Sequence, residues 1–458
     1  MALRKNLKRI GLTVLLLVLI AVVIIARKVF PAVSGYGAKN MASAIYLQHR
    51  NPNDVIKEDL ADFPKSLGRY EFNQQDSSVT ASVWGFAKRK AIYRSGLGAT
   101  LINDFTEEQV RAQQFNLPSK PSINSDTILW PYGDKIVDTI PDNVNRTGLE
   151  RAIDHVFEEK KNGESVYTRA VIACYDGNII AERYAPGFDK NSVQLGWSMS
   201  KSLTAAIIGI LVKEGKLNVN VPAPVPEWKG NEKEKISLLN LLQQTSGLDF
   251  AEIYTRPSEV TTMLFSKGDM AAYTASRPLK YAPGTQFNYS SGNSNILSRI
   301  IRHTVGEKDY AAFPHTALFH KINAYSFLLE PDASGTYIGS SYSYATARDF
   351  VRFGLLYYNN GKWNGEQILP DNWVKESVVP PASNSFKNYG YQFWLNGQNE
   401  KDITKKAFPD VPDDMFYMDG YGGQDVYIIP SKKLVVLRLG VSTINENKFL
   451  KEVMGAIQ

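Results

Sequence analysis

The sequence predicts an α+β fold in which one antiparallel sheet is assembled from both ends of a domain and is flanked by helices. Strand-like runs at 170–175 and 179–184 flank Asp176-Gly177-Asn178, a strong hairpin signal. Near the end of the chain, runs at 426–429 and 434–439 flank Pro430-Ser431-Lys432-Lys433, a second hairpin. Apolar residues at helical spacing fill the sequence between these hairpins, so we expect a helical insert within the sheet domain.

The helices follow from the spacing of apolar side chains. Residues 148–160 carry apolar positions three and four apart, and 449–457 is expected to close the chain as a helix. Thr346-x-x-Asp349 is typical of a capping box before a helix over 350–356. The Pro- and Ser-containing stretch 118–134 is interpreted as a linker or a wrapping arm.

Composition indicates a globular chain with no general affinity for nucleic acid. The chain has 458 residues, 43% of them hydrophobic, which favours two or three domains. Its net charge of +6 comes from the first 28 residues, because the remaining 46 basic residues balance the 46 acidic ones. The single cysteine, Cys174, excludes an intrachain disulfide and lies in an apolar run, so it is expected in the core.

The N-terminus carries an uncharged run rich in Leu, Val and Ile over residues 10–26, close to the shortest stretch that spans a bilayer. Arg27-Lys28 follows directly, with no adjacent cleavage site, so we expect an uncleaved transmembrane helix. More basic residues precede the run than follow it. The predicted location is therefore the inner (cytoplasmic) membrane, single-pass, with the catalytic domain on the periplasmic side.

The expected organisation has three parts: residues 1–28 as membrane anchor, 29–145 as an N-terminal extension and 146–458 as the main domain. The extension contains a strand-like run at 79–84 and a short acidic helix between two Pro-containing breakers, Asn51-Pro52 and Phe63-Pro64. It contains no catalytic pattern.

A candidate nucleophile opens the first helix of the main domain. Ser198-Met199-Ser200-Lys201 precedes apolar residues at helical spacing, and residues 198 and 201 lie one turn apart on one face. A serine hydroxyl needs a base, and a lysine desolvated against a core helix is able to serve as one. The alternative is that the S-x-x-K pattern occurs by chance and that Ser198 only caps the helix. Ser200 and Ser202 lack a lysine three residues on.

Further segments follow the S-x-x-K pattern in a distinctive order. The segment 241–248 contains Thr245-Ser246-Gly247-Leu248, and Pro283-Gly284-Thr285 leads to Tyr289-Ser290-Ser291. With these motifs the sequence over 148–458 resembles the class C β-lactamase and penicillin-binding-protein superfamily of serine hydrolases. It looks most similar to the esterase and amidase branch that includes 6-aminohexanoate-dimer hydrolase, which the segments 330–335, 347–349 and 353–356 also resemble. The resemblance implies a β-lactamase/transpeptidase-like fold.

The resemblance implies roles for the remaining site residues. Tyr289 would shuttle protons beside Lys201, and Ser291 stands where relatives carry asparagine. Tyr421, Gly422 and Gly423 occupy the place of the K-T-G motif and would line the substrate. The lysine that would hold a substrate carboxylate is missing there, with Tyr421 in its place. The backbone amides of Ser198 and Gln424 would form the oxyanion hole.

The predicted function is hydrolysis of a small ester or amide through a covalent acyl-enzyme on Ser198, with no cofactor and no metal. None of the five histidines lies in a recognised motif, so a Ser-His-Asp triad has no support. One alternative is β-lactamase or DD-peptidase activity on the same residues. Another is a non-catalytic envelope protein that keeps the fold for binding. The expected partners are the small-molecule substrate and the membrane, with no nucleic acid.

Overall fold

The computed structural model describes residues 2–137 and 139–458, with side chains described except at 1–5, 7–8, 18–22, 24–25 and 138. The chain forms two compact units. The first contains residues 1–94, 99–111 and 251–268, and the second contains 95–98, 112–250 and 269–458. The predicted division into segments 1–28, 29–145 and 146–458 stays a prediction.

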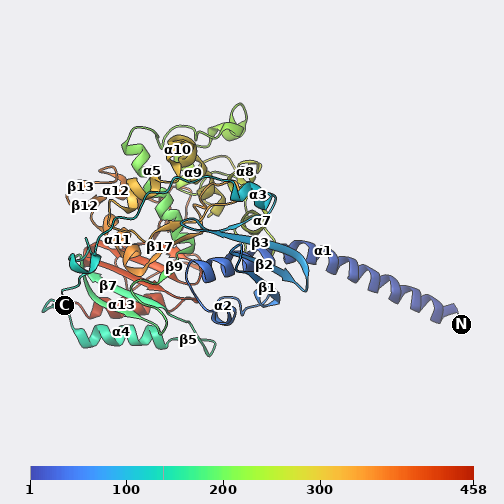
Figure 1. The fold of residues 1–458 in the computed structure, drawn as a ribbon, viewed down its shortest axis with the longest axis horizontal. Helices are drawn as coiled ribbons and strands as arrows, with labels where there is room; N and C mark the ends of the chain where they lie inside the picture. Colours follow the sequence, from blue (N-terminus) through green and yellow to red (C-terminus); the bar gives the residue numbers. More distant parts are fainter. Residues whose placement is uncertain (1, 138) are drawn as a thin grey trace. The chain divides into compact units, whose positions relative to one another are not determined.

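The second unit is organised around a six-stranded antiparallel sheet in the order β14-β17-β18-β19-β7-β8. Strands β7 and β8 come from the first predicted hairpin, and β18 and β19 come from the second (Figure 1). In that order the strands span Trp394–Leu395, Phe416–Gly420, Gln424–Ile429, Leu434–Leu439, Ala170–Tyr175 and Asn178–Tyr184. The central pairing joins the two ends of the domain, since Ile172 lies opposite Leu437. The predicted sheet built from both ends is confirmed.

Alternation of side chains along the strands gives this sheet two buried faces. One face packs against α4 (Arg146–Glu158) and α13 (Glu446–Gly455). The other face packs against α11 (Ala347–Tyr358), behind which lies α5 (Ser200–Lys213). Cys174 points into this second core and is fully buried, as predicted.

The helical insert lies between β9 (Val193–Leu195) and β14, and its longest member is α9 (Ser291–Val305), which packs against α5. A small sheet, β10-β11-β9, stands beside it. The further helices of this unit are α6 (Leu238–Leu242), α8 (Met270–Ala275), α10 (Glu307–Tyr310) and α12 (Trp373–Ser377). Its further strands are β5 (Lys160–Lys161), β6 (Glu164–Ser165), β10 (Leu328–Leu329), β11 (Ser343–Thr346), β12 (Lys362–Trp363), β13 (Glu366–Gln367), β15 (Gln398–Asn399) and β16 (Asp402–Lys406).

The first unit is a four-stranded sheet, β1-β2-β3-β4, covered by the C-terminal half of α1 (Ala2–Tyr46). Its core contains Ala38, Met41 and Ala42 of that helix together with residues of β2, β3 and β4. Its other elements are α2 (Pro52–Glu58), β1 (Gly68–Asn73), β2 (Ser78–Val83), β3 (Phe86–Arg94), β4 (Gly98–Leu101), α3 (Glu107–Arg111) and α7 (Glu259–Ser266). The strand expected at 79–84 and the short helix after Pro52 are both present.

The prediction of an N-terminal transmembrane helix is wrong. Among the residues that the structure describes, no helix combines the length and the apolar character needed to cross a bilayer. The run at 10–26 was at the lower limit of length, and the helix that contains it continues past Arg27 and Lys28 to Tyr46. The same finding contradicts the predicted single-pass location in the inner membrane. It also leaves the periplasmic catalytic domain and the membrane partner without support.

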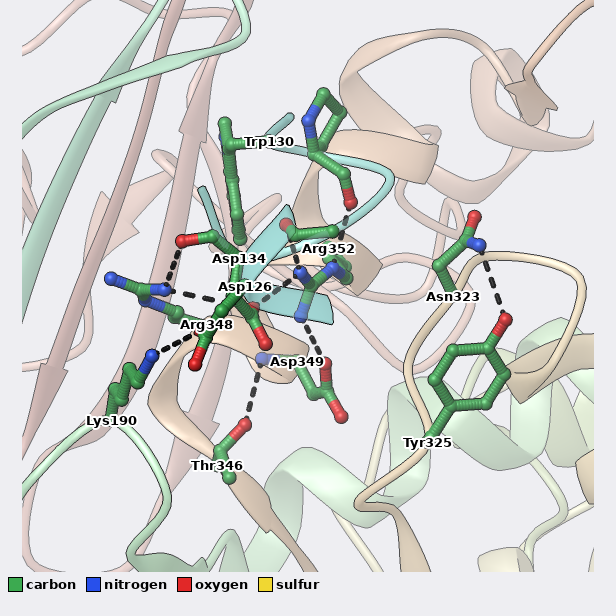
Figure 2. Close-up of polar contacts among 12 residues, drawn as sticks. Asp126, Trp130, Asp134, Lys190, Asn323, Tyr325, Thr346, Arg348, Asp349 and Arg352 are labelled. Carbon is green, nitrogen blue, oxygen red and sulfur yellow. Dashed lines mark hydrogen bonds and ion pairs between the residues drawn. The ribbon is translucent and has the colours of Figure 1, made fainter. Parts of the chain in front are cut away.

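The stretch around 125–135 is an irregular arm held against the sheet domain by two arginines of α11 (Figure 2). Arg352 donates to Pro131 O at 2.8 Å and to Asp134 Oδ1 at 2.7 Å, and its guanidinium lies 4.6 Å from the Trp130 ring centroid. Arg348 donates to Asp134 O at 2.8 Å. The Thr346 hydroxyl caps α11, as the sequence predicts. Over residues 130–134, the stretch predicted as a linker or a wrapping arm therefore lies against the sheet domain.

Candidate active site

The candidate nucleophile stands in a tight turn between β9 and α5. Trp197, immediately before it, adopts a left-handed conformation with φ 46°, which is strained for a bulky residue and is typical of functional sites. Ser198 is half-buried in the short 3₁₀ turn Trp197–Met199. The end of β17 approaches this turn so closely that a Cβ on Gly420 would lie 2.3 Å from Gly196 O. Only glycine fits at position 420, and the turn is thereby set beside the edge of the sheet.

Lys201 lies on the same helix face as Ser198, as the spacing predicts, and its side chain is 1% exposed. Its Nζ is 2.9 Å from Ser198 Oγ, 3.1 Å from Ser291 Oγ and 3.0 Å from Ser340 O. Burial removes the water that would otherwise solvate an ammonium. The amine is thus desolvated and held by oxygens from three different segments.

The other hydroxyls of the motif are committed elsewhere. Ser200 Oγ donates to Trp197 O at 2.7 Å and lies 2.7 Å from Ser343 Oγ, from which it can accept. Ser202 Oγ donates to Gln392 O at 2.7 Å. Both serines are 1% exposed, so of the three hydroxyls in this segment Ser198 is the accessible one.

Tyr289 and Ser291 reach Lys201 from the start of α9. Ser290 caps this helix by accepting from Asn293 N at 3.3 Å. Lys201 Nζ lies over the Tyr289 ring, 4.9 Å from its centroid. The same ring is 5.2 Å from Trp394 and 5.6 Å from Tyr389, centroid to centroid, so aromatic side chains enclose this side of the site.

The segment in the position of the third motif forms the turn between β17 and β18. Gly423 N donates to Gly420 O at 3.0 Å, and Gly422 supplies the positive φ of 82° that this turn requires. Tyr421 is 54% exposed, and its ring lies 5.7 Å from that of Trp197. The side chain of Gln424 points away from Ser198, since it pairs with both backbone groups of Gly440. Only the backbone of residue 424 is left for an oxyanion role.

A buried charged cluster that the sequence analysis missed lies beside this turn. Asp425 faces Asp419 across β17 and β18 and Arg438 across β18 and β19, with both Asp425 and Arg438 fully buried. Arg438 donates to Gly422 O at 3.0 Å and to Gly423 O at 2.9 Å, and also to Thr168 Oγ1 at 2.9 Å. Charged residues inside otherwise apolar strands were the available signal. Arg438 therefore stabilises the glycine turn by hydrogen bonds to two of its backbone carbonyls.

The titration of this cluster is dominated by burial. Burial raises the pKa of Asp425 well above its ordinary value, and the charges of Glu446 and Asp419 raise it further. Burial likewise raises the pKa of Glu446 to about 7 and lowers that of Arg438 to about 10. Within the described part of the chain, neither carboxyl oxygen of Asp425 meets a donor. A protonated carboxyl is the form that this environment favours.

A sheet domain of this topology, with a buried lysine one turn after a half-buried serine, defines a serine hydrolase of the β-lactamase fold. The family model described as Beta-lactamase matches residues 153–447, and the chain belongs to this family. The resemblance inferred from the sequence is confirmed.

Individual relatives agree with this assignment. The chain is 26% identical to a 6-aminohexanoate-dimer hydrolase of Paenarthrobacter ureafaciens, over 60% of this chain and 73% of that protein. Among solved structures it is similar to a putative 6-aminohexanoate-dimer hydrolase from Bacillus anthracis, with a TM-score of 0.55, 19% identity and coverage of 89% of this chain and 96% of that one. A penicillin-binding-protein homologue from Caulobacter crescentus superposes with a TM-score of 0.53 and 15% identity, over 71% of this chain and all of that chain.

Proposed function

We propose that this protein hydrolyses an ester or amide through a covalent acyl-enzyme on Ser198. The observation that carries the proposal is the 2.9 Å contact between Ser198 Oγ and the buried Lys201 Nζ. Such a contact gives the serine a base within hydrogen-bond reach, which general-base catalysis requires. The backbone amides of Ser198 and Gln424 are the proposed oxyanion donors.

Lys201 is proposed to act as a neutral amine. A neutral amine has two N–H donors and one lone pair, whereas an ammonium has only donors. In the proposed reactive form, Nζ donates to Ser340 O and to Ser291 Oγ, and its lone pair takes the Ser198 hydroxyl proton. Tyr289, whose ring lies against Nζ, is the proposed second carrier of that proton.

The proposed reaction has two balanced steps. Ser198 Oγ bonds to the substrate carbonyl carbon, and its proton passes through Lys201 and Tyr289 to the leaving oxygen or nitrogen. The bond to that atom breaks, which releases an alcohol or amine and leaves an acyl ester on Ser198. Water then attacks the ester carbonyl, returns one proton to Ser198 and releases the carboxylic acid.

The walls of the site favour an uncharged substrate of linear, apolar character. Aromatic rings of Trp197, Tyr289, Trp394 and Tyr421 stand around the Ser198–Lys201 pair. Arg348 is unavailable to hold a substrate carboxylate, because it is paired with Glu182 at 2.6 and 2.7 Å and is 6% exposed. The name of the Paenarthrobacter relative, 6-aminohexanoate-dimer hydrolase, supports an amide as the bond that is cleaved.

The experiment that tests the proposal is covalent labelling. Incubation with a fluorophosphonate is expected to add one phosphonyl group per chain, detected by intact-mass spectrometry and mapped to the peptide that contains Ser198. Ser200→Ala is the matched control and should label to the same extent, because the Ser200 hydroxyl is buried in other hydrogen bonds. An adduct on any other residue, or no adduct, would contradict the proposed nucleophile.

Tyr421 is expected to limit the hydrolysis of carboxylate-bearing substrates such as β-lactams. A charge-assisted hydrogen bond contributes about 1.5–3 kcal/mol, and about 1.4 kcal/mol corresponds to a factor of ten in rate. Tyr421→Lys should therefore raise kcat/KM for nitrocefin roughly ten- to a hundredfold relative to p-nitrophenyl butyrate. A wild-type protein that already prefers nitrocefin to the butyrate would instead favour the β-lactamase alternative.

A further inference from the structure

Two buried glutamines below the site hold backbone conformations that glutamine rarely adopts. Gln244 has φ 60° and is 0% exposed, and Gln392 has φ 57° and is 2% exposed. A non-glycine residue in the left-handed region is strained and persists only where its surroundings hold it there. Gln244 Nε2 donates to Gln392 Oε1 at 3.3 Å, so the two strained residues are also partners.

Gln244 grips the chain on both sides of Tyr289. Its backbone oxygen accepts from Asn288 N at 2.8 Å, one residue before the tyrosine. Its side-chain Oε1 accepts from Ser290 N at 3.2 Å, one residue after it, and from Asn293 Nδ2 at 2.8 Å in the first turn of α9. One residue therefore fixes the backbone of Tyr289 from two directions and ties it to the helix that follows.

Gln392 connects Gln244 and α9 to α5, the helix that carries Lys201. Its backbone oxygen accepts from Ser202 Oγ, next to Lys201, and its Oε1 accepts from Ser294 Oγ on α9 at 2.6 Å. Its Nε2 donates to Leu241 O and Leu242 O, just before Gln244. The glutamine pair thus links the segment of Tyr289 to the start of α5.

We propose that Gln244 is a positioning residue that holds Tyr289 against Lys201 by anchoring Asn288 and Ser290 on either side of it. This inference rests on the proposed function, because it assigns Gln244 a role only through Tyr289. Gln244 is fully buried and does not touch substrate. Its loss should lower kcat, which depends on the Lys201–Tyr289 geometry, more than it changes KM.

The test is a double-mutant cycle between Gln244→Met and Tyr289→Phe. Methionine keeps the length of the side chain and removes its hydrogen bonds to Ser290, Asn293 and Gln392, while the backbone bond from Asn288 N stays. The kcat of Gln244→Met for p-nitrophenyl butyrate is expected to fall at least tenfold. In the Tyr289→Phe background the same substitution should change kcat less than twofold, because the group that Gln244 positions is already gone. Gln243→Met is the matched control and should keep wild-type kcat, since the Gln243 amide makes a long 3.4 Å contact with Val379 O and none with the segment of Tyr289 among the described residues.

A purely structural role gives a different pattern. If Gln244→Met lowers kcat by the same factor with and without the Tyr289 hydroxyl, the inference is wrong. If Tyr289→Phe alone leaves kcat unchanged, Tyr289 does not carry the proton, and that part of the proposed function is wrong. Gln244→Glu separates a positioning role from misfolding, because it keeps the acceptor for Ser290 and Asn293. At an equal folded fraction, measured by circular dichroism, this variant should retain a higher kcat than Gln244→Met.

Discussion

Ser198→Ala and Lys201→Met are each expected to lower kcat/KM for an ester by about three to four orders of magnitude, and the double variant should be no slower than the worse single one. Residues that act as a unit are non-additive, because removing either one already stops the step that needs both. Steady-state kinetics on all three variants measures this. The 2.9 Å contact between the two side chains is the structural reason to treat them as one unit.

The control for this series is Lys213→Met. Lys213 lies at the far end of α5, exposed, where its Nζ reaches Gln367 O, and it has no path to Ser198. Its variant should keep wild-type kcat/KM. Additive losses from Ser198 and Lys201, on the logarithmic scale, would mean that lysine does not act on the serine and would contradict the proposed base.

Arg438→Met is expected to destabilise the protein by about 3–5 kcal/mol, because the buried carbonyls of Gly422 and Gly423 and the Thr168 hydroxyl lose their donor, at roughly 1–3 kcal/mol for each buried group left unsatisfied. Arg438 is 0% exposed and supplies hydrogen bonds to Gly422, Gly423 and Thr168. Urea unfolding at fixed pH measures the loss. Arg183→Met is the control: Arg183 on β8 forms a partly exposed ion pair with Asp154 of α4, and its loss should cost less than about 1 kcal/mol.

The cost of Arg438→Met should also grow as pH rises. Asp425 has a raised pKa in the folded state, so folded protein holds this proton more tightly than unfolded chain and stability falls as pH rises above about 4. Arg438 opposes that shift, so without it the fall extends to higher pH, and the difference from wild type should widen as pH rises above the folded-state pKa of Asp425 in the wild type. The other groups around Asp425 are present in both proteins: Asp419, Tyr427 and Glu446. If the difference in unfolding free energy between wild type and Arg438→Met stays constant or narrows as pH rises, Asp425 is not the cause of the pH dependence.

The sheet and the Ser198–Lys201 pair were predictable because each depends on local sequence rules. Alternating and helical periodicities place side chains on one face or another without reference to distant residues, and two residues one turn apart on a helix must be neighbours. The hairpins at 170–184 and 426–439 and the helix after Ser198 therefore appear where the periodicity placed them.

The parts that sequence could not supply are contacts between distant segments. No local sequence pattern predicts that Lys201 hydrogen-bonds to Ser340 O, or that Gln244 hydrogen-bonds to the residues on either side of Tyr289. The membrane prediction failed for a related reason: a run of apolar residues was judged alone, although the helix continues into a segment packed against a separate small sheet. Glu182, the partner of Arg348, is likewise remote from it in sequence.

The pairing of β7 with β19 has a consequence for how the chain acquires its fold during synthesis. Strand β7 is made early, yet its partner is completed only near the last helix, since Ile172 pairs with Leu437. Ser198, Tyr289 and both strained glutamines lie between those two strands in sequence. Until the C-terminal strands emerge from the ribosome, one edge of β7 stays open and the insert has no completed sheet to pack on. Non-local pairing of this kind slows folding and exposes strand edges, so demand for chaperones should peak late in translation.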